Sequence, residues 1–170
     1  MARFLFPLII VALFTGTILQ SQTANADWPA FLGGESRSSA AEFTPPLKWT
    51  PAEGIGWQVK LPGHGQSSPI IVGDRIYLTA VEGPMKNNNL VLCHSLITGE
   101  LLWKKSFPSS LPVANNVYTS RAAPTPSADA TGVFAFFESG NLVALTPEGE
   151  VRWERDLIKD YGKYVGRFGL

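Results

Sequence analysis

The sequence contains a single cysteine, and it has no excess of positive or negative charge. Cys93 is the only cysteine among 170 residues, so the chain cannot form an internal disulfide and its stability must come from burial. Lysine plus arginine and aspartate plus glutamate both number 14, which leaves a formal net charge of zero. A balanced charge gives no electrostatic reason to expect nucleic acid or an anionic membrane as a partner.

The sequence also lacks the motifs of the common catalytic and metal-binding classes. The glycines beside His64 are not accompanied by the lysine and helix of a phosphate-binding loop, and no nucleophile elbow, zinc-protease helix or calcium loop is present. His64 has no neighbouring co-ligand, whereas zinc sites need three or four ligands. Cys93 and His94 are adjacent on a predicted strand, so their side chains point to opposite faces and do not form a nucleophile–base pair. We interpret Cys93 as a small buried apolar residue.

Long hydrophobic sequence is confined to residues 1–26. Arg3 precedes an almost unbroken apolar run from Phe4 to Leu13, and the segment ends in Ala24-Asn25-Ala26, a small-x-small cleavage pattern. The run is too short and too interrupted for a membrane span, which needs about 20 apolar residues. We therefore expect a secretory signal peptide cleaved after Ala26 and a mature domain of residues 27–170. The mature protein would be periplasmic or extracellular and would have no membrane span.

Two copies of a turn followed by tryptophan are the strongest pattern in the mature sequence. The turn at Gly99 leads to Trp103, and the turn at Gly149 leads to Trp153. The two glycines are 50 positions apart, and so are the two tryptophans. A repeat of roughly 40–50 residues that contains several strands is typical of propeller blades.

Each repeat predicts one four-stranded antiparallel blade. The apolar runs of the first repeat predict strands over 67–72, 75–80, 89–95 and 101–103. Those of the second predict strands over 132–137, 141–145 and 151–153, after a segment at Pro124 that parallels Pro69. Residues 56–61 alternate apolar and polar side chains, which predicts a further half-buried strand. We therefore expect an all-β fold, an incomplete β-propeller of about two to three blades.

These turns resemble the pyrroloquinoline-quinone (PQQ) repeat propellers, a family that includes the barrel-assembly lipoprotein B of the outer membrane and the quinoprotein alcohol dehydrogenases. Their repeat ends in a strand, an acidic residue, Thr-Gly and an apolar strand with tryptophan. Residues 92–103 carry this pattern, with Ser95 in place of the usual aspartate. The opening Trp28-Pro29-x-Phe31 is similar to that of exported members of the superfamily. The resemblance covers residues 27–170 and implies that glycine and tryptophan are structural, the ring of one blade packing against its neighbour.

The resemblance leaves two classes of function open. A quinoprotein oxidoreductase needs PQQ, usually with calcium, together with an aspartate base and often a vicinal cysteine pair, which a chain with one cysteine lacks. The aspartates are candidates by residue type alone; they are Asp74, Asp129, Asp156 and Asp160. We favour a non-enzymatic exported scaffold that binds a protein or peptide, with no catalytic, cofactor-binding or metal residues. The alternative is part of a PQQ-dependent oxidoreductase.

Closure of the propeller is a further expectation. Propellers close with about 4–8 blades, whereas this sequence predicts two clear blades. We expect the chain to be the N-terminal part of a larger propeller or a half that associates with itself or another chain, because an open array leaves strand edges and a blade face uncovered. Such an edge could accept a strand from a partner.

Overall fold

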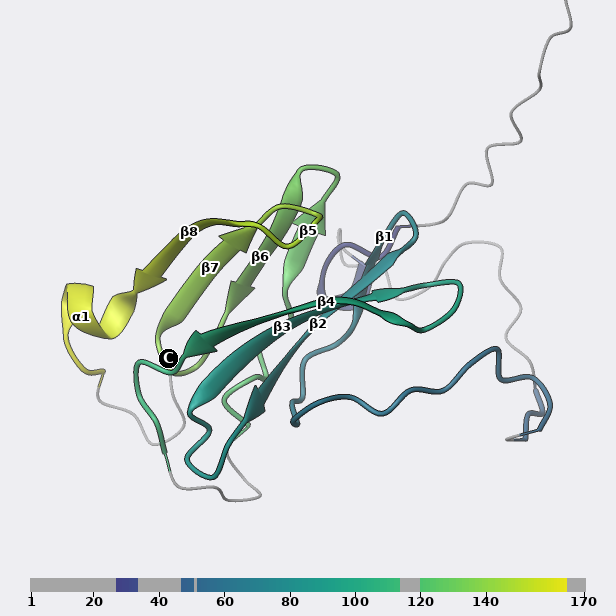
Figure 1. Ribbon diagram of the computed structural model, residues 1–170, viewed down its shortest axis with the longest axis horizontal. Coiled ribbons are helices and arrows are strands. Elements are labelled where there is room, and N and C mark those ends of the chain that lie inside the picture. The colour runs from purple at the N-terminus through teal and green to yellow at the C-terminus, as the bar shows by residue number, and fades with distance from the viewer. Residues whose placement is uncertain (1–26, 34–46, 51, 114–119, 165–170) are drawn as a thin grey trace, which may run out of the picture.

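The structure is a computed structural model that describes residues 27–33, 47–50, 52–113 and 120–164. The predicted signal peptide, with Ala24 and Ala26, lies outside the described residues. The described strands form two four-stranded antiparallel sheets, each with its strands in sequence order (Figure 1). The predicted all-β fold of four-stranded antiparallel blades is therefore confirmed.

Each sheet is one blade. Blade 1 contains β1 (Ile70–Val72), β2 (Arg75–Glu82), β3 (Asn88–Ser95) and β4 (Leu101–Pro108). Blade 2 contains β5 (Ser127–Asp129), β6 (Gly132–Phe136), β7 (Asn141–Leu145) and β8 (Val151–Asp156). A short 3₁₀ turn, η1 (Phe31–Gly33), precedes blade 1, and helix α1 (Leu157–Tyr161) follows blade 2. Within the described ranges, no helix is long and apolar enough to cross a membrane.

The strands keep the predicted order but differ from the predicted bounds: β1 begins only at Ile70, β2 continues to Glu82 and β8 continues to Asp156. β4 continues past Trp103 to Pro108, because β3 pairs with it along that whole length. Phe107, four residues beyond the predicted end of this strand, is therefore part of β4 and only 4% exposed. The strand predicted over 56–61 is not formed, because these residues pair with no strand in the described part of the chain.

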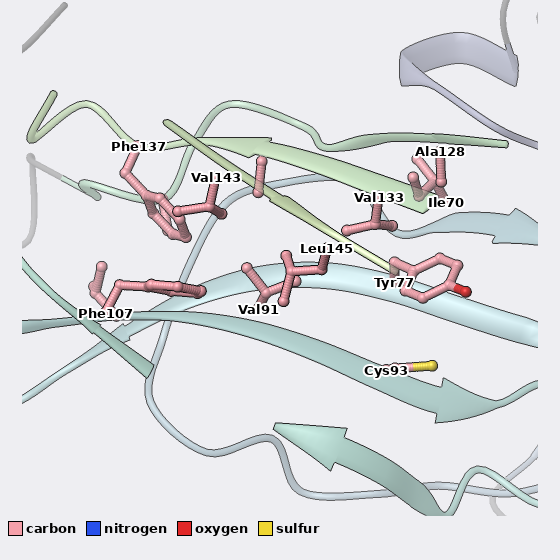
Figure 2. Close-up of a cluster of buried hydrophobic side chains, with 13 residues drawn as sticks. Ile70, Tyr77, Val91, Cys93, Phe107, Ala128, Val133, Phe137, Val143 and Leu145 are labelled. Carbon is pink, nitrogen blue, oxygen red and sulfur yellow. The ribbon is translucent and has the colours of Figure 1, made fainter. Parts of the chain in front are cut away.

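The main hydrophobic core lies between the two blades. Alternate side chains of β2 and β3 face alternate side chains of β6 and β7, as the period-two geometry of strands requires. Figure 2 shows this cluster, whose members include Tyr77, Val91, Cys93, Val133, Val143 and Leu145. All six are at most 2% exposed. Each blade therefore buries one face against the other and depends on it for stability.

A buried polar group also joins the blades. Asn141 Oδ1 accepts hydrogen bonds from Asn89 Nδ2 (2.9 Å) and from Ser139 Oγ (2.9 Å). The same oxygen accepts from the backbone N–H of Ser110 (2.9 Å), and the Asn141 amide donates to the Pro108 carbonyl (3.1 Å). Asn141 is only 2% exposed. It therefore ties β7 of blade 2 to β3 and to the connection that leaves β4.

We expect Asn141→Ala to lower the free energy of unfolding by about 2–4 kcal/mol, because it leaves several buried donors without an acceptor. Urea denaturation followed by tryptophan fluorescence measures this loss. Ser127→Ala, at an exposed position of β5, is the control. A loss within about 0.5 kcal/mol of the control would show that this polar group does not join the blades.

Candidate functional site

Trp103 of β4 fastens blade 1 to blade 2. Its indole lies on Gly149 in the β7–β8 turn, where a Cβ atom would be only 2.7 Å from Trp103 Cδ2. The indole Nε1 donates to the Pro147 carbonyl at 2.9 Å. Gly149 also has a φ of +87°, a conformation that side chains disfavour. Glycine is thus required here both by the backbone and by the approach of the ring.

The Pro147 carbonyl accepts a second hydrogen bond from blade 1. The Arg75 guanidinium at the start of β2 donates to it. The same guanidinium lies 3.5 Å from the Glu148 carboxylate. The β7–β8 turn is therefore held by an aromatic contact, two hydrogen bonds and one partly exposed ion pair.

Trp57 repeats this arrangement on the other side of blade 1. Its Nε1 donates to the Leu96 carbonyl at 2.9 Å. A Cβ atom on Gly99 would lie 2.6 Å from Trp57 Cε3, and Gly99 has a φ of +75°. The β3–β4 turn of blade 1 thus receives a tryptophan in the same way as the β7–β8 turn of blade 2.

The sequence reasoning named Trp103 and Trp153 as repeat positions and missed Trp57. Glu53-Gly54 precedes Trp57, but its glycine is three positions before the tryptophan instead of four, so the spacing that located the other two does not include Trp57. A different signal was available in the sequence. Trp57 precedes Pro62 by five positions, as Trp103 precedes Pro108.

Trp153 of β8 has the same place in blade 2 as Trp103 has in blade 1. Trp103 lies beside Tyr77, with ring centroids 5.9 Å apart and an interplanar angle of 45°. Trp153 lies beside Phe134 at 6.1 Å and 43°. Blade 2 covers the first pair, and Tyr77 is 2% exposed. Phe134 and Trp153 are 39% and 41% exposed, so blade 2 presents an open aromatic face in the described structure.

Pro69 and Pro124 lie at the inner edges of the blades. Pro69 directly precedes β1, and Pro124 lies three residues before β5. Their segments run side by side, since the Ser68 N–H donates to Thr125 Oγ1 at 3.1 Å. These segments bring the first strands of the two blades together.

Cys93 and His94 point to opposite faces of β3. The Cys93 thiol lies in the interblade core (Figure 2), and burial raises its pKa to about 12, so it stays protonated at neutral pH. His94 Nδ1 lies 2.8 Å from the Gly99 carbonyl oxygen. A carbonyl only accepts, so Nδ1 is the donor in this contact. The two side chains do not form a nucleophile–base pair.

The four candidate aspartates lie in separate local structures. Asp74 is an exposed residue of the β1–β2 turn, and Asp129 accepts hydrogen bonds within the β5–β6 turn. Asp156 caps α1, and Asp160 pairs with Arg155 at 2.8 Å. Among the described residues, no three His, Cys, Asp or Glu side chains gather as a metal site requires. The four aspartates therefore do not form one site within the described ranges.

One family comparison covers most of the described structure. Residues 47–164, more than half of the chain, match the family model described as outer membrane protein assembly factor BamB. The matched range contains both blades together with Trp57 and both tryptophan–glycine contacts. No curated protein matches the chain.

We expect Gly149→Ala to cost more stability than Gly73→Ala. Gly73 also has positive φ, +60°, but a Cβ atom there meets nothing within 4 Å. In both variants a side chain at positive φ lowers the free energy of unfolding by about 1 kcal/mol. Gly149→Ala must also displace the Trp103 ring, which adds about 1–3 kcal/mol. Equal losses in urea denaturation would show that the ring does not require the glycine.

The buried Cys93 thiol makes the stability of the fold depend on pH in the alkaline range. The unfolded thiol releases its proton near its ordinary pKa of 9.0, whereas the folded protein retains the proton up to a pKa of about 12. The contribution of the buried neutral thiol to the free energy of unfolding is complete below pH 9. It is lost as the pH rises between these two pKa values, by about 1.4 kcal/mol per pH unit. Burial also raises the pKa of Tyr77, whose similar effect begins near pH 10.

Urea denaturation between pH 7 and pH 10 measures this slope. We expect Cys93→Ala to flatten it between pH 9 and pH 10. An identical slope in the natural protein and in Cys93→Ala would show that the thiol is not the group responsible.

Proposed function

Since this chain belongs to the PQQ-like repeat propeller family of the outer membrane protein assembly factor BamB, we propose that it is an exported, non-enzymatic scaffold that binds another protein. The observation that supports this function is the open aromatic face formed by Phe134 and Trp153. Exposed apolar surface of this kind marks protein contact sites. Export is proposed from the signal peptide expected over residues 1–26.

The contact between the two blades suggests what a partner needs. Blade 2 covers the Tyr77–Trp103 pair with a turn whose glycine lies against the indole and whose Pro147 carbonyl accepts the Nε1 hydrogen. A partner that covers the Phe134–Trp153 pair would present the same two features. A glycine-containing turn with a free carbonyl is therefore the proposed recognition element.

The family description adds a class of partner. BamB is described as an assembly factor for outer membrane proteins, so its description implies protein partners. For this chain we propose only that the partner is a protein or peptide. The net charge of zero is consistent with an apolar contact rather than with electrostatic recognition.

Photo-crosslinking in the natural host tests the proposal. A p-benzoylphenylalanine introduced in place of Phe134 should cross-link to a second polypeptide. The same group in place of Ile97, a 73% exposed residue of the β3–β4 turn, is the control and should not. Equal capture at both positions, or cross-linking only within the protein's own chain, would contradict a partner-binding face.

A second measurement separates the scaffold from the quinoprotein alternative. The full protein from its host is mixed with PQQ and calcium and then freed of unbound quinone. We expect no quinone absorbance to remain and no dye-linked dehydrogenase activity to appear. Retained quinone with such activity would overturn the non-enzymatic function.

A further inference from the structure

The Trp28-Pro29 pair lies against the first strands of both blades (Figure 1). Trp28 exchanges two backbone hydrogen bonds with Ile71 of β1: its N–H donates to the Ile71 carbonyl at 2.7 Å, and its carbonyl accepts from the Ile71 N–H at 2.8 Å. The Pro29 carbonyl accepts from the N–H of Ala128 in β5 at 3.0 Å. Residues 27–33, which we call the strap, therefore join blade 1 to blade 2 at their first strands.

The strap bonds to the backbone groups that the two sheets leave unused. β1 and β5 are the terminal strands of their sheets, so each has one edge that its own sheet does not pair. Ile71 and Ala128 are the central residues of these three-residue strands. Ile71 turns its N–H and its carbonyl to Trp28, and Ala128 turns its N–H to Pro29. The strap therefore covers the middle of both free edges.

The order tryptophan then proline suits this crossing. Successive residues of an extended chain direct their backbone groups to opposite sides, so Trp28 faces β1 while Pro29 faces β5. Proline has a carbonyl but no N–H, so it can accept from Ala128 but cannot donate a second bond to β5. The contact with β5 is therefore limited to one hydrogen bond at this position, and the two blades remain separate sheets.

Two side chains hold the ends of the strap. Asp27 Oδ1 accepts a hydrogen bond from the N–H of Gly73 in the β1–β2 turn at 2.8 Å. At the other end, the Trp28 ring lies on Gly33, where a Cβ atom would be 2.8 Å from Trp28 Cε3 and φ is +80°. The Gly33 N–H donates to the Ala30 carbonyl at 2.9 Å, which closes the turn over the ring. Trp28 therefore contributes both the backbone pairing with β1 and the side-chain anchor.

We infer that the free edges of β1 and β5 together form a strand-addition site, and that the strap is its occupant within the same chain. Main-chain hydrogen bonds to Ile71 and Ala128 hold the occupant, and the Trp-Pro pair selects it. The docked strap excludes other extended chains from both edges. When the strap is released, the site binds an extended peptide that carries Trp-Pro.

The site is distinct from the face assigned to a protein partner. It lies at the first strands of the blades, whereas Phe134 and Trp153 lie on β6 and β8 of blade 2. The inference therefore does not depend on the proposed function, and a peptide that binds at the edges is told apart from one that covers the aromatic face by which amides it protects.

Amide hydrogen exchange on the mature protein tests the strap. The Ile71 and Ala128 amides should exchange at least about 100-fold more slowly than in an unstructured chain. Trp28→Ala should speed both by about tenfold or more, because the ring no longer holds the strap. Phe31→Ala removes a 61% exposed aromatic side chain of the same segment and should leave both rates unchanged. Unchanged rates in Trp28→Ala, or equal acceleration in both variants, would overturn the inference.

A peptide added in excess tests the binding site itself. A synthetic peptide of residues 27–33 should restore slow exchange at Ile71 and Ala128 in the Trp28→Ala protein and should have no effect on the natural protein. The same peptide with alanine in place of tryptophan is the control and should restore neither amide. If Trp28→Ala also loosens β3, the natural peptide should protect β3 again, because a ligand that binds only the folded state stabilises it. Restoration by both peptides or by neither would contradict a strand-addition site.

Discussion

An indole ring laid on a positive-φ glycine is the interaction on which the arrangement of the blades depends. Among the described blade turns it occurs with Trp57 on Gly99 and with Trp103 on Gly149, and each of these indole N–H groups also donates to a carbonyl two or three residues before the glycine. The ring cannot approach so closely if the turn carries a side chain, and the turn needs glycine for its backbone. One residue type therefore serves both the hairpin within a blade and the contact between blades.

Burial follows from this contact. Once Trp103 places blade 1 against blade 2, alternate residues of β2, β3, β6 and β7 meet in a single core. Cys93 is part of that core and its thiol stays neutral there, whereas the adjacent His94 faces the opposite side of the sheet. Blade 1 therefore packs one face against blade 2. Its opposite face lines a groove of about 400 Å³ together with Trp57.

The sequence predicted the fold class through the 50-residue offset between the Gly99 and Gly149 turns, because tight turns leave a strong local signal. The extent of β4 was not predictable from local sequence, since its pairing with β3 is a long-range property that lysines at 104 and 105 obscure. Helix α1 was missed because it is short and is started by a single capping side chain, Asp156. The role of Trp57 follows only from the three-dimensional fold, because its glycine lies about 40 residues away in the sequence.

A double-mutant cycle between Trp103 and Gly149 tests the central claim most directly. The free energies of unfolding are measured for the natural protein, Trp103→Ala, Gly149→Ala and the double variant. If the ring requires the glycine, Gly149→Ala costs less once the ring is gone, and the coupling energy is about 1–2 kcal/mol. Costs that add within about 0.3 kcal/mol would show that the two residues act independently and would contradict the account.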